Sequence, residues 1–265
     1  MKQAIRNHLS SDHPWRDHIL WFDTIDSTNT HAKTLALRGA PHGTVLIAGG
    51  QTGGRGRMGR SFHSPAGAGI YMSVLLRPGC PPAELMHLTC AAAVAACDAV
   101  EAAADIRPSI KWTNDLVYGK RKLAGILTEL VLDKTGNISC AIIGIGINCS
   151  QQLSDFPEEL RDMAGSLSCI TGRDISRAGV AAALMEQLER MDRQLLTGRD
   201  AMLARYRRDC VTLGQQIRLL RGEDVRYGTA LDIDDRGALV VRFDDGITEA
   251  VSSGEVSIRG MYGYL

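Results

Sequence analysis

Two short apolar runs, TVLIA at residues 44–48 and IYMSVLL at residues 70–76, flank a loop that contains the string GRGRMGR at residues 54–60. Both runs are typical of buried β-strands, so the sequence predicts a sheet with an arginine- and glycine-rich loop between two of its strands. Glycine allows positive φ and close approach of the backbone, and the guanidinium groups of Arg55, Arg57 and Arg60 carry permanent positive charge. This combination predicts a loop that binds an anionic ligand.

The same kind of string also occurs in disordered segments that coat RNA and in exposed turns, and the string alone leaves these alternatives open. Disordered arginine-glycine segments lie in polar, low-complexity sequence, whereas apolar strands flank this one. The 30 Lys plus Arg residues are balanced by 30 Asp plus Glu residues, so no overall field favours nucleic acid or an anionic membrane. We therefore expect a local anion site, with no nucleic-acid partner and no membrane partner.

The order of patterns along the 265 residues predicts an α/β domain followed by a small β-domain. We expect helices at residues 30–37, 81–104, 176–196 and 200–211, and strands at 44–48, 70–76, 110–115, 123–133 and 139–149. Four more short strands, at 216–220, 225–233, 238–243 and 247–258, predict a closed or half-closed β-barrel. The predicted domains are therefore residues 1–212 and 213–265.

Cysteine usage and the N-terminal segment indicate the compartment. The seven cysteines contain no CxxC pair, which is typical of reduced thiols that pack in a cytosolic protein. The first residues lack the apolar core of a signal peptide, and no run approaches the roughly 20 apolar residues of a membrane span. We therefore expect a cytoplasmic protein.

Two further strings place polar side chains beside apolar runs. In KWTND, strand alternation would put Lys111, Thr113 and Asp115 on one face; the alternative is a turn with Trp112 in the core. The string RKLAGI places Lys122 directly before an apolar strand, where a lysine is expected to emerge at the mouth of a cleft.

Glycines and short polar side chains mark two other candidate segments. GIGINC at residues 144–149 alternates glycine with apolar residues, which fits either close helix packing or the wall of a ligand pocket. DSTN at residues 26–29 combines a helix-capping pattern with hydroxyl and amide groups that suit an uncharged polar ligand head.

These strings, in this order and at these separations, resemble a biotin protein ligase: DSTN, QTGGRGRMGRSFHSPAGAGIYMSVLLRP, KWTNDLVYGKRKLAGILTEL and GIGINC. The resemblance extends over residues 22–258. It implies a mixed-sheet catalytic domain of the class II synthetase-like type, followed by an SH3-like β-barrel. It also implies that biotin and ATP, with Mg²⁺, form biotinyl-5′-AMP, and that biotin then passes to a lysine of a biotin carboxyl carrier protein.

The resemblance assigns roles residue by residue. It implies that biotin contacts Ser27, Thr28, Asn29, Gln51, Arg55, Gly56, Arg57 and Lys122. It implies that ATP contacts Arg55, Arg57, Arg60, Phe62, Lys111, Asn114, Lys122, Asn148 and Arg259. The expected catalytic residues are Lys122, Arg57, Asp115 and Lys111, with Asp115 as the candidate Mg²⁺ ligand. Basic groups suit this chemistry because carboxylate attack on a phosphate brings two anions together.

The sequence departs from the family pattern at Thr113, where proline is usual, and at Met58, where a basic residue is common. Only some twenty residues precede the resemblance, so we expect no DNA-binding repressor function. The oligomer is expected to be a monomer or a homodimer. Two alternatives remain: a lipoate or octanoate transferase of the related family, and a non-catalytic nucleotide- or RNA-binding module.

Overall fold

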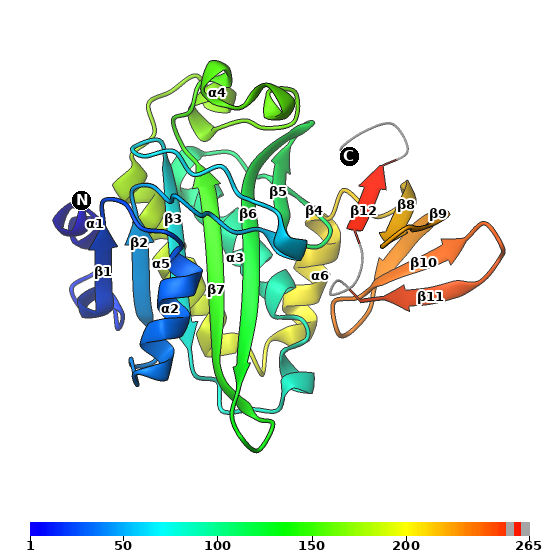
Figure 1. The fold of residues 1–265 in the computed structure, drawn as a ribbon, viewed down its shortest axis with the longest axis horizontal. Helices are drawn as coiled ribbons and strands as arrows, with labels where there is room; N and C mark the ends of the chain where they lie inside the picture. The colour runs from blue at the N-terminus through cyan, green and yellow to red at the C-terminus, as the bar shows by residue number, and fades with distance from the viewer. Residues whose placement is uncertain (253–256, 261–265) are drawn as a thin grey trace.

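A seven-stranded mixed sheet organises the larger part of the chain (Figure 1). The computed structural model describes residues 1–252 and 257–260, and only the backbone of 257–260. The strand order is β1-β2-β3-β7-β6-β5-β4, in which β1 and β2 are parallel and the other neighbours are antiparallel. The strands are β1 (Ile19–Phe22), β2 (Thr44–Ala48), β3 (Gly69–Leu76), β4 (Ser109–Lys111), β5 (Asp115–Tyr118), β6 (Arg121–Leu132) and β7 (Ile138–Asn148).

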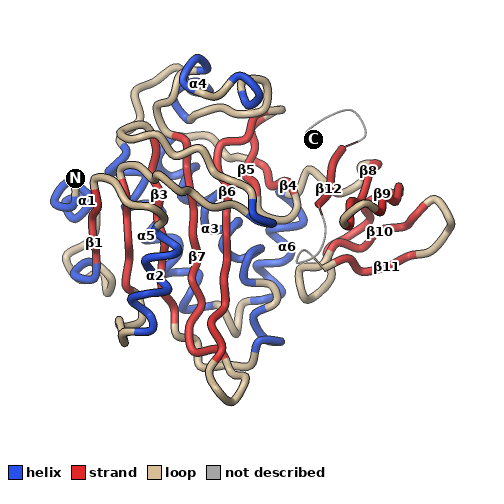
Figure 2. Tube along the Cα trace, in the orientation of Figure 1, coloured by secondary structure: helices blue, strands red, loops and turns tan. Residues whose placement is uncertain are grey.

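Helices cover both faces of this sheet (Figures 1 and 2). One face carries α2, which packs against β3 and β7, and the other carries α3 and α5, which pack against each other and the sheet. The α-helices are α1 (Lys2–His8), α2 (Thr28–Leu37), α3 (Leu88–Ala104), α4 (Leu167–Thr171), α5 (Arg177–Gln194) and α6 (Arg199–Asp209). Short 3₁₀ helices are η1 (Arg16–His18), η2 (Arg57–Gly59), η3 (Pro82–Leu85), η4 (Leu153–Asp155) and η5 (Glu158–Leu160).

Coverage of both faces explains why β2 is apolar throughout rather than alternating. Val45 and Ile47 join the main core beneath α3 and α5, whereas Leu46 packs with Ala32 of α2 and Ile142 of β7 on the opposite face. All residues of β2 and β3 are buried. The predicted strands on either side of the arginine loop are therefore confirmed, and the loop itself lies between two fixed elements.

Helix α3 combines small side chains with nearly complete burial. Among the described residues, the helical stretch Pro82–Ala104 is long and apolar enough, with a mean hydropathy of 1.4, to cross a membrane by composition alone. The expectation that no run approaches a membrane span was therefore too strict. Within the fold, 72% of the most apolar part of this stretch is buried. Ala92, Ala93 and Ala96 are fully buried, so the stretch is a core helix that lies close against the sheet.

Three segments differ from the sequence-based expectation. Residues 110–115 are not one strand: β4 ends at Lys111, β5 begins at Asp115, and the Trp112–Thr113 peptide between them is cis. The N-terminal residues form α1 and β1, which their short apolar patterns did not predict. Residues 247–258 are not one strand either, because they contain the whole of one strand, Thr248–Val251, and the start of another, Ser257–Gly260.

The C-terminal strands form a five-stranded antiparallel sheet, as expected for the small β-domain, in the order β11-β10-β9-β8-β12. They are β8 (Gln216–Arg221), β9 (Asp224–Ile233), β10 (Leu239–Phe243), β11 (Thr248–Val251) and β12 (Ser257–Gly260). The turn between β9 and β10 reaches the larger sheet, because the Trp112 Nε1–H group donates to the Gly237 carbonyl at 3.1 Å. The small sheet therefore contacts the segment that joins β4 and β5.

Candidate active site

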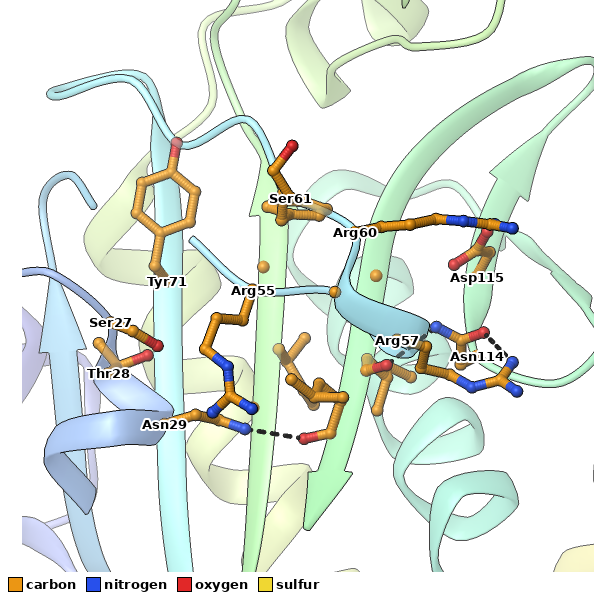
Figure 3. A pocket seen from close by; sticks show the side chains of 18 of the residues that line it. Ser27, Thr28, Asn29, Arg55, Arg57, Arg60, Ser61, Tyr71, Asn114 and Asp115 are labelled. Atoms are coloured by element: carbon orange, nitrogen blue, oxygen red, sulfur yellow. Dashed lines mark hydrogen bonds between the residues drawn. The ribbon is translucent and has the colours of Figure 1, made fainter. Parts of the chain in front are cut away.

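A cleft lies over β3, β7 and β6, between the N-terminus of α2, the loop of residues 54–60 and the β4–β5 hairpin (Figure 3). It contains nearly every predicted site residue: Ser27, Thr28, Asn29, Gln51, Arg55, Gly56, Arg57, Arg60, Phe62, Lys111, Asn114, Asp115 and Lys122. Five of these side chains are basic, and Asp115 is the one carboxylate among the lining residues. The cleft is therefore positively charged although the chain as a whole is neutral.

Uncharged polar groups at the start of α2 form one end of the cleft. Ser27 is the N-cap, and its Oγ accepts from the Thr30 N–H group. The Thr28 N–H and hydroxyl groups both donate to Gln51 Oε1, at 2.8 and 3.1 Å. Gln51 in turn donates to Ser64 Oγ at 3.1 Å. The three buried side chains Ser27, Thr28 and Asn29 are thus held by capping and side-chain hydrogen bonds.

Asn29 is tied to the sheet. Its Nδ2 group donates to the Leu127 carbonyl at 3.2 Å and to Glu129 Oε2 at 2.9 Å, and Ser73 Oγ lies 2.6 Å from Asn29 Oδ1. Gly144 makes this position possible, because a Cβ there would lie 2.0 Å from Asn29 Oδ1. The GIGINC string has two interpretations, close helix packing or the wall of a ligand pocket. At Gly144 the structure shows close packing of α2 on the sheet.

The arginine loop folds back on itself as a narrow hairpin. The Phe62 N–H group donates to the Gly54 carbonyl at 2.9 Å, and the Gly56 N–H group donates to the Arg60 carbonyl at 2.7 Å. A side chain at Gly54 would place its Cβ 2.4 Å from the Phe62 carbonyl oxygen, so only glycine fits this crossing. At the tip, Met58 adopts a positive φ of 55°.

The three arginines of the loop point in different directions (Figure 3). Arg55 binds both carboxylate oxygens of Glu129, at 3.2 and 3.0 Å. Arg57 donates to Asn114 Oδ1 at 3.1 Å, and Arg60 extends over the side of the cleft where Asp115 lies. Burial lowers the pKa of Arg57, and the charge of Asp115 partly offsets this effect.

The β4–β5 hairpin brings cationic and acidic groups together. Lys111 pairs with Asp115 across the hairpin, so these two side chains share a face of the sheet as cross-strand neighbours and not by alternation along one strand. Lys122 Nζ donates to Asp115 Oδ1 at 2.6 Å. Asn114 is fixed to β6, because its Nδ2 group donates to the Ile126 carbonyl at 2.9 Å. Lys111, although charged, is buried.

Phe62 lies on the glycines of the central strands. A Cβ at Gly146 would lie 2.5 Å from Phe62 Cε1, and one at Gly125 would lie 3.1 Å from Phe62 Cε2. The Lys122 ammonium lies 5.9 Å from the centroid of the ring, within the range of a cation–π interaction. The pocket-wall interpretation of the GIGINC string therefore holds at Gly146.

Two predicted site residues stand apart from the rest. Asn148 is buried outside the cleft, where its Nδ2 group donates to the Gly165 carbonyl at 3.0 Å and its Oδ1 accepts from Gln151 at 3.2 Å. The structure thus does not bring Asn148 to the other ATP residues. Arg259 belongs to β12, but its side chain lies outside the described part of the chain.

Sequence reasoning missed Glu129, Lys33 and Ser73, which hold the polar end of the cleft together. A faint signal for Glu129 existed, since a carboxylate stands near the middle of an otherwise apolar strand. Nothing local to Lys33 or Ser73 distinguishes them from ordinary surface and strand residues.

Within the described residues no group of three or more His, Cys, Asp or Glu side chains is arranged to hold a metal ion. A magnesium ion is commonly held by one or two carboxylates together with phosphate oxygens and water. The carboxylate of Asp115 among basic groups fits a magnesium ion that enters with a nucleotide.

Comparison with known proteins agrees with this arrangement. The Biotin/lipoate A/B protein ligase family matches residues 21–148, and the Biotin protein ligase C terminal domain matches residues 212–259. The chain is 41% identical over 237 residues to the Bifunctional ligase/repressor BirA of Bacillus spizizenii, covering 89% of this chain and 73% of that protein. It is 35% identical to the Biotin--[acetyl-CoA-carboxylase] ligase of Mycobacterium tuberculosis, covering 87% and 85%.

A solved structure also resembles it, the biotin protein ligase from Aquifex aeolicus in complex with biotin and ATP. Its TM-score is 0.77 at 30% identity, and the match covers 91% of this chain and 98% of that one. The fold predicted from the resemblance, a mixed-sheet catalytic domain followed by a small β-domain, is confirmed. On both the sequence and the structural matches, the chain belongs to the biotin/lipoate A/B protein ligase family, among its biotin protein ligases.

Proposed function

We propose that this protein activates biotin with ATP to biotinyl-5′-AMP and transfers the biotinyl group to a lysine of a biotin carboxyl carrier protein. The observation that carries the proposal is the chemical division of the cleft. Ser27, Thr28 and Gln51 offer uncharged hydrogen-bonding groups at one end, and Arg57, Arg60, Lys111 and Lys122 offer positive charge at the other. Biotin has an uncharged ureido head and a carboxylate tail, so it matches both ends at once.

At the polar end, Ser27 is the proposed donor to the ureido oxygen. Its Oγ accepts from the Thr30 N–H group, and within the described part of the chain its own hydrogen is not used in a hydrogen bond. Gln51 has one amide hydrogen committed to Ser64, which leaves a second for a ligand. Asn29 has a supporting role, since its amide is already engaged with the sheet and Glu129.

At the cationic end, a biotin carboxylate oxygen forms a bond to the α-phosphorus of ATP. The bond from that phosphorus to the bridging β-phosphate oxygen breaks, and pyrophosphate leaves. Lys122 and Lys111 stabilise the negative charge of the reacting oxygens, and Arg57 and Arg60 contact the phosphates from the loop. Asn114 positions Arg57 through the hydrogen bond at 3.1 Å. Phe62 packs against adenine.

Asp115 would hold a magnesium ion that enters with ATP, and the ion would supply positive charge that offsets part of the triphosphate charge. Asp115 also holds the Lys122 ammonium at 2.6 Å, which keeps that group over the cleft before substrate binds. Loss of Asp115 would therefore affect both the metal and the lysine.

In the second step, the ε-amine of the acceptor lysine attacks the acyl carbon of the adenylate. The bond between this carbon and the phosphate oxygen breaks, AMP leaves, and the proton of the amine passes to solvent. No side chain of the ligase becomes acylated. The loop of residues 54–60 lies over the cleft, so it is placed to exclude the water that would hydrolyse the anhydride.

Several finer features belong to the same proposal. We propose two domains, residues 1–212 and 213–265, in a cytoplasmic enzyme that acts as a monomer or a homodimer. The end of α6 at Asp209 and the start of β8 at Gln216 support this division. The absence of repressor function, and the contact of Arg259 with the nucleotide, stay predictions.

The test measures two products of the first step: pyrophosphate, and the acyl-adenylate that retains a label from the α-phosphate of ATP. The reactions contain biotin, lipoate or neither acid, and each is run with Mg²⁺ or with excess chelator. We expect release and a labelled acyl-adenylate with biotin and Mg²⁺ only. Equal release with lipoate would favour a lipoate-type transferase. Salt-sensitive RNA binding with no adenylate would favour a binding module and overturn the proposal.

A further inference from the structure

The carboxylate of Glu129 joins three parts of the chain. It lies in β6 and accepts from Asn29 Nδ2 at 2.9 Å and from Lys33 Nζ at 2.6 Å, both on α2. It also accepts from both terminal nitrogens of Arg55, at 3.2 and 3.0 Å. One carboxylate therefore connects the sheet, the helix at the polar end of the cleft and the first arginine of the loop.

The environment of this carboxylate distinguishes it from a surface ion pair. Its side chain is 14% exposed, whereas the Arg55 and Lys33 side chains are 43% and 38% exposed. A bidentate contact between a guanidinium and a carboxylate fixes the relative orientation of the two groups as well as the distance between them. Burial raises the pKa of Glu129, but hydrogen bonds from Lys33 and Asn29 and the charges of Lys33 and Arg55 outweigh burial and lower it overall.

A chain of hydrogen bonds continues from Glu129 into the polar end of the cleft. Asn29 contacts Ser73 Oγ at 2.6 Å, and Ser73 Oγ lies 2.8 Å from Thr28 Oγ1. The single hydroxyl hydrogen of Ser73 serves one of these two oxygens at a time. Thr28 then donates to Gln51. Through these contacts the position of Glu129 affects the positions of the side chains that we propose to bind the biotin head.

Arg55 and Arg57 attach the loop to two different parts of the protein. Arg57 is bound to Asn114 at the phosphate end, whereas Arg55 is bound to Glu129. In Figure 3 the Arg55 side chain points toward Asn29 and away from Asn114. The Arg55 guanidinium therefore binds a carboxylate of the protein itself. The contact of Arg55 with ATP stays a prediction.

From these contacts we infer that Glu129 is a positioning residue: by binding Arg55 and Asn29 together, it fixes the start of the arginine loop over the biotin head. The inference rests on the proposed function. It predicts that Glu129 controls the KM for biotin, whereas the Arg57 and Asn114 side of the loop controls ATP. Because Glu129 does not touch the reacting atoms, its loss is expected to alter kcat less than the KM for biotin.

The first test measures kinetics of pyrophosphate release for Glu129→Gln in the full chain. Loss of a charged hydrogen-bonded anchor corresponds to roughly a 10- to 100-fold effect. We expect the KM for biotin to rise by about 10-fold or more, with the KM for ATP changing less than about 3-fold. Glu101→Gln is the matched control, since Glu101 also pairs with an arginine, Arg107, but lies outside the cleft.

A second variant covers the case in which Glu129→Gln does not fold. Arg55→Gln breaks the same link from its more exposed side and leaves Lys33 and Asn29 on Glu129. If the link carries the effect, Arg55→Gln also raises the KM for biotin, and the double variant is no worse than the worse single variant. Additive effects of the two changes would contradict the inference.

A third measurement does not depend on activity. Trypsin cleavage after Arg57 or Arg60, followed by mass spectrometry, reports exposure of the loop in each ligand-free variant. We expect cleavage in Glu129→Gln and Arg55→Gln to be several-fold faster than in the parent and in Glu101→Gln. If the two variants are cleaved at the parent rate and also keep the parent KM for biotin, the inference is overturned. If the parent itself forms no adenylate but the variants are cleaved faster than the parent, only the proposed reaction is overturned.

Discussion

The Phe62 ring lies directly on the backbone of Gly146, where a Cβ would be 2.5 Å from Phe62 Cε1. The loop that carries the arginines and the strand that carries the GIGINC string therefore meet at one contact, on the floor of the cleft. The Tyr71 ring packs against the Phe62 ring in a T-shaped arrangement, with 6.4 Å between their centroids. Any side chain at residue 146 would move the ring that we propose to pack against adenine.

Gly146→Ala is therefore expected to displace Phe62. Overpacking of this kind costs about 1–3 kcal/mol of stability, and we expect the KM for ATP to rise by roughly 10-fold. The measurement combines urea unfolding with the kinetics of pyrophosphate release. Gly179→Ala is the control, because its Cβ would make only ordinary contacts, with Ser176 at 3.4 Å or more and with His8 at 4.0 Å. An unchanged KM for ATP would remove Phe62 from the adenine site.

Lys122→Gln removes the ammonium that lies 2.6 Å from Asp115. We expect adenylate formation to fall by about 10²- to 10³-fold, because a group that stabilises charge on the reacting oxygens is lost. Circular dichroism should show that the fold persists, since Lys122 contributes little to the core. Lys120→Gln, in the adjacent exposed turn, should retain parent activity. Parent-like turnover in Lys122→Gln would exclude the lysine from catalysis.

Arg57→Gly removes the contact between the loop and Asn114. We expect the adenylate to form but to escape faster, because the loop loses its support at the phosphate end. Separation of bound from free labelled adenylate by rapid gel filtration measures the escape rate. Arg38→Gly, at the exposed end of α2, controls for the loss of one arginine. Retention of the adenylate equal to that of the parent would contradict the clamp role of Arg57.

Trp112→Phe tests the contact between the small sheet and the β4–β5 hairpin. It removes the hydrogen bond to the Gly237 carbonyl and part of a buried ring. We expect the free energy of unfolding to fall by about 1–3 kcal/mol, measured in urea. Trp21→Phe loses a comparable bond, to Asp23, at a less buried site, and should cost under about 1 kcal/mol. Equal costs would show that the contact with Gly237 adds nothing.

His87 predicts a pH dependence of stability. Burial lowers its pKa in the folded protein, although the hydrogen bond to the Leu195 carbonyl opposes this shift. Below about pH 6.5 the unfolded chain binds a proton that the folded protein does not, so stability falls as pH falls. Between pH 7.5 and 5.5 the parent should lose more stability in urea than His87→Gln, by at most about 1.4 kcal/mol per pH unit. Parallel losses would show that His87 does not titrate differently on unfolding.

Local patterns were sufficient for much of the fold. Residues 44–48 and 70–76 are apolar throughout because helices cover both faces of their sheet, and this run of apolar side chains is visible in the sequence. KWTND misled because a turn of three residues interrupts it, so that Lys111 and Asp115 face each other across a hairpin and do not alternate along one strand. Alternation of residues in the sequence predicts which side chains share a face of a sheet only where the strand is continuous.

The sequence by itself determined the family and which segments form the cleft, because strings of residues that contact a ligand are local and recur in order. The tertiary structure decided what each side chain does there. Arg55 and Arg57 are two residues apart and chemically identical, yet one binds Glu129 and the other Asn114. Glu129, 74 positions away in the sequence, sets the direction of the Arg55 side chain. Charged groups and hydrogen-bond acceptors that are distant in sequence can set a side chain's direction in this way where burial removes the water that would compete for it.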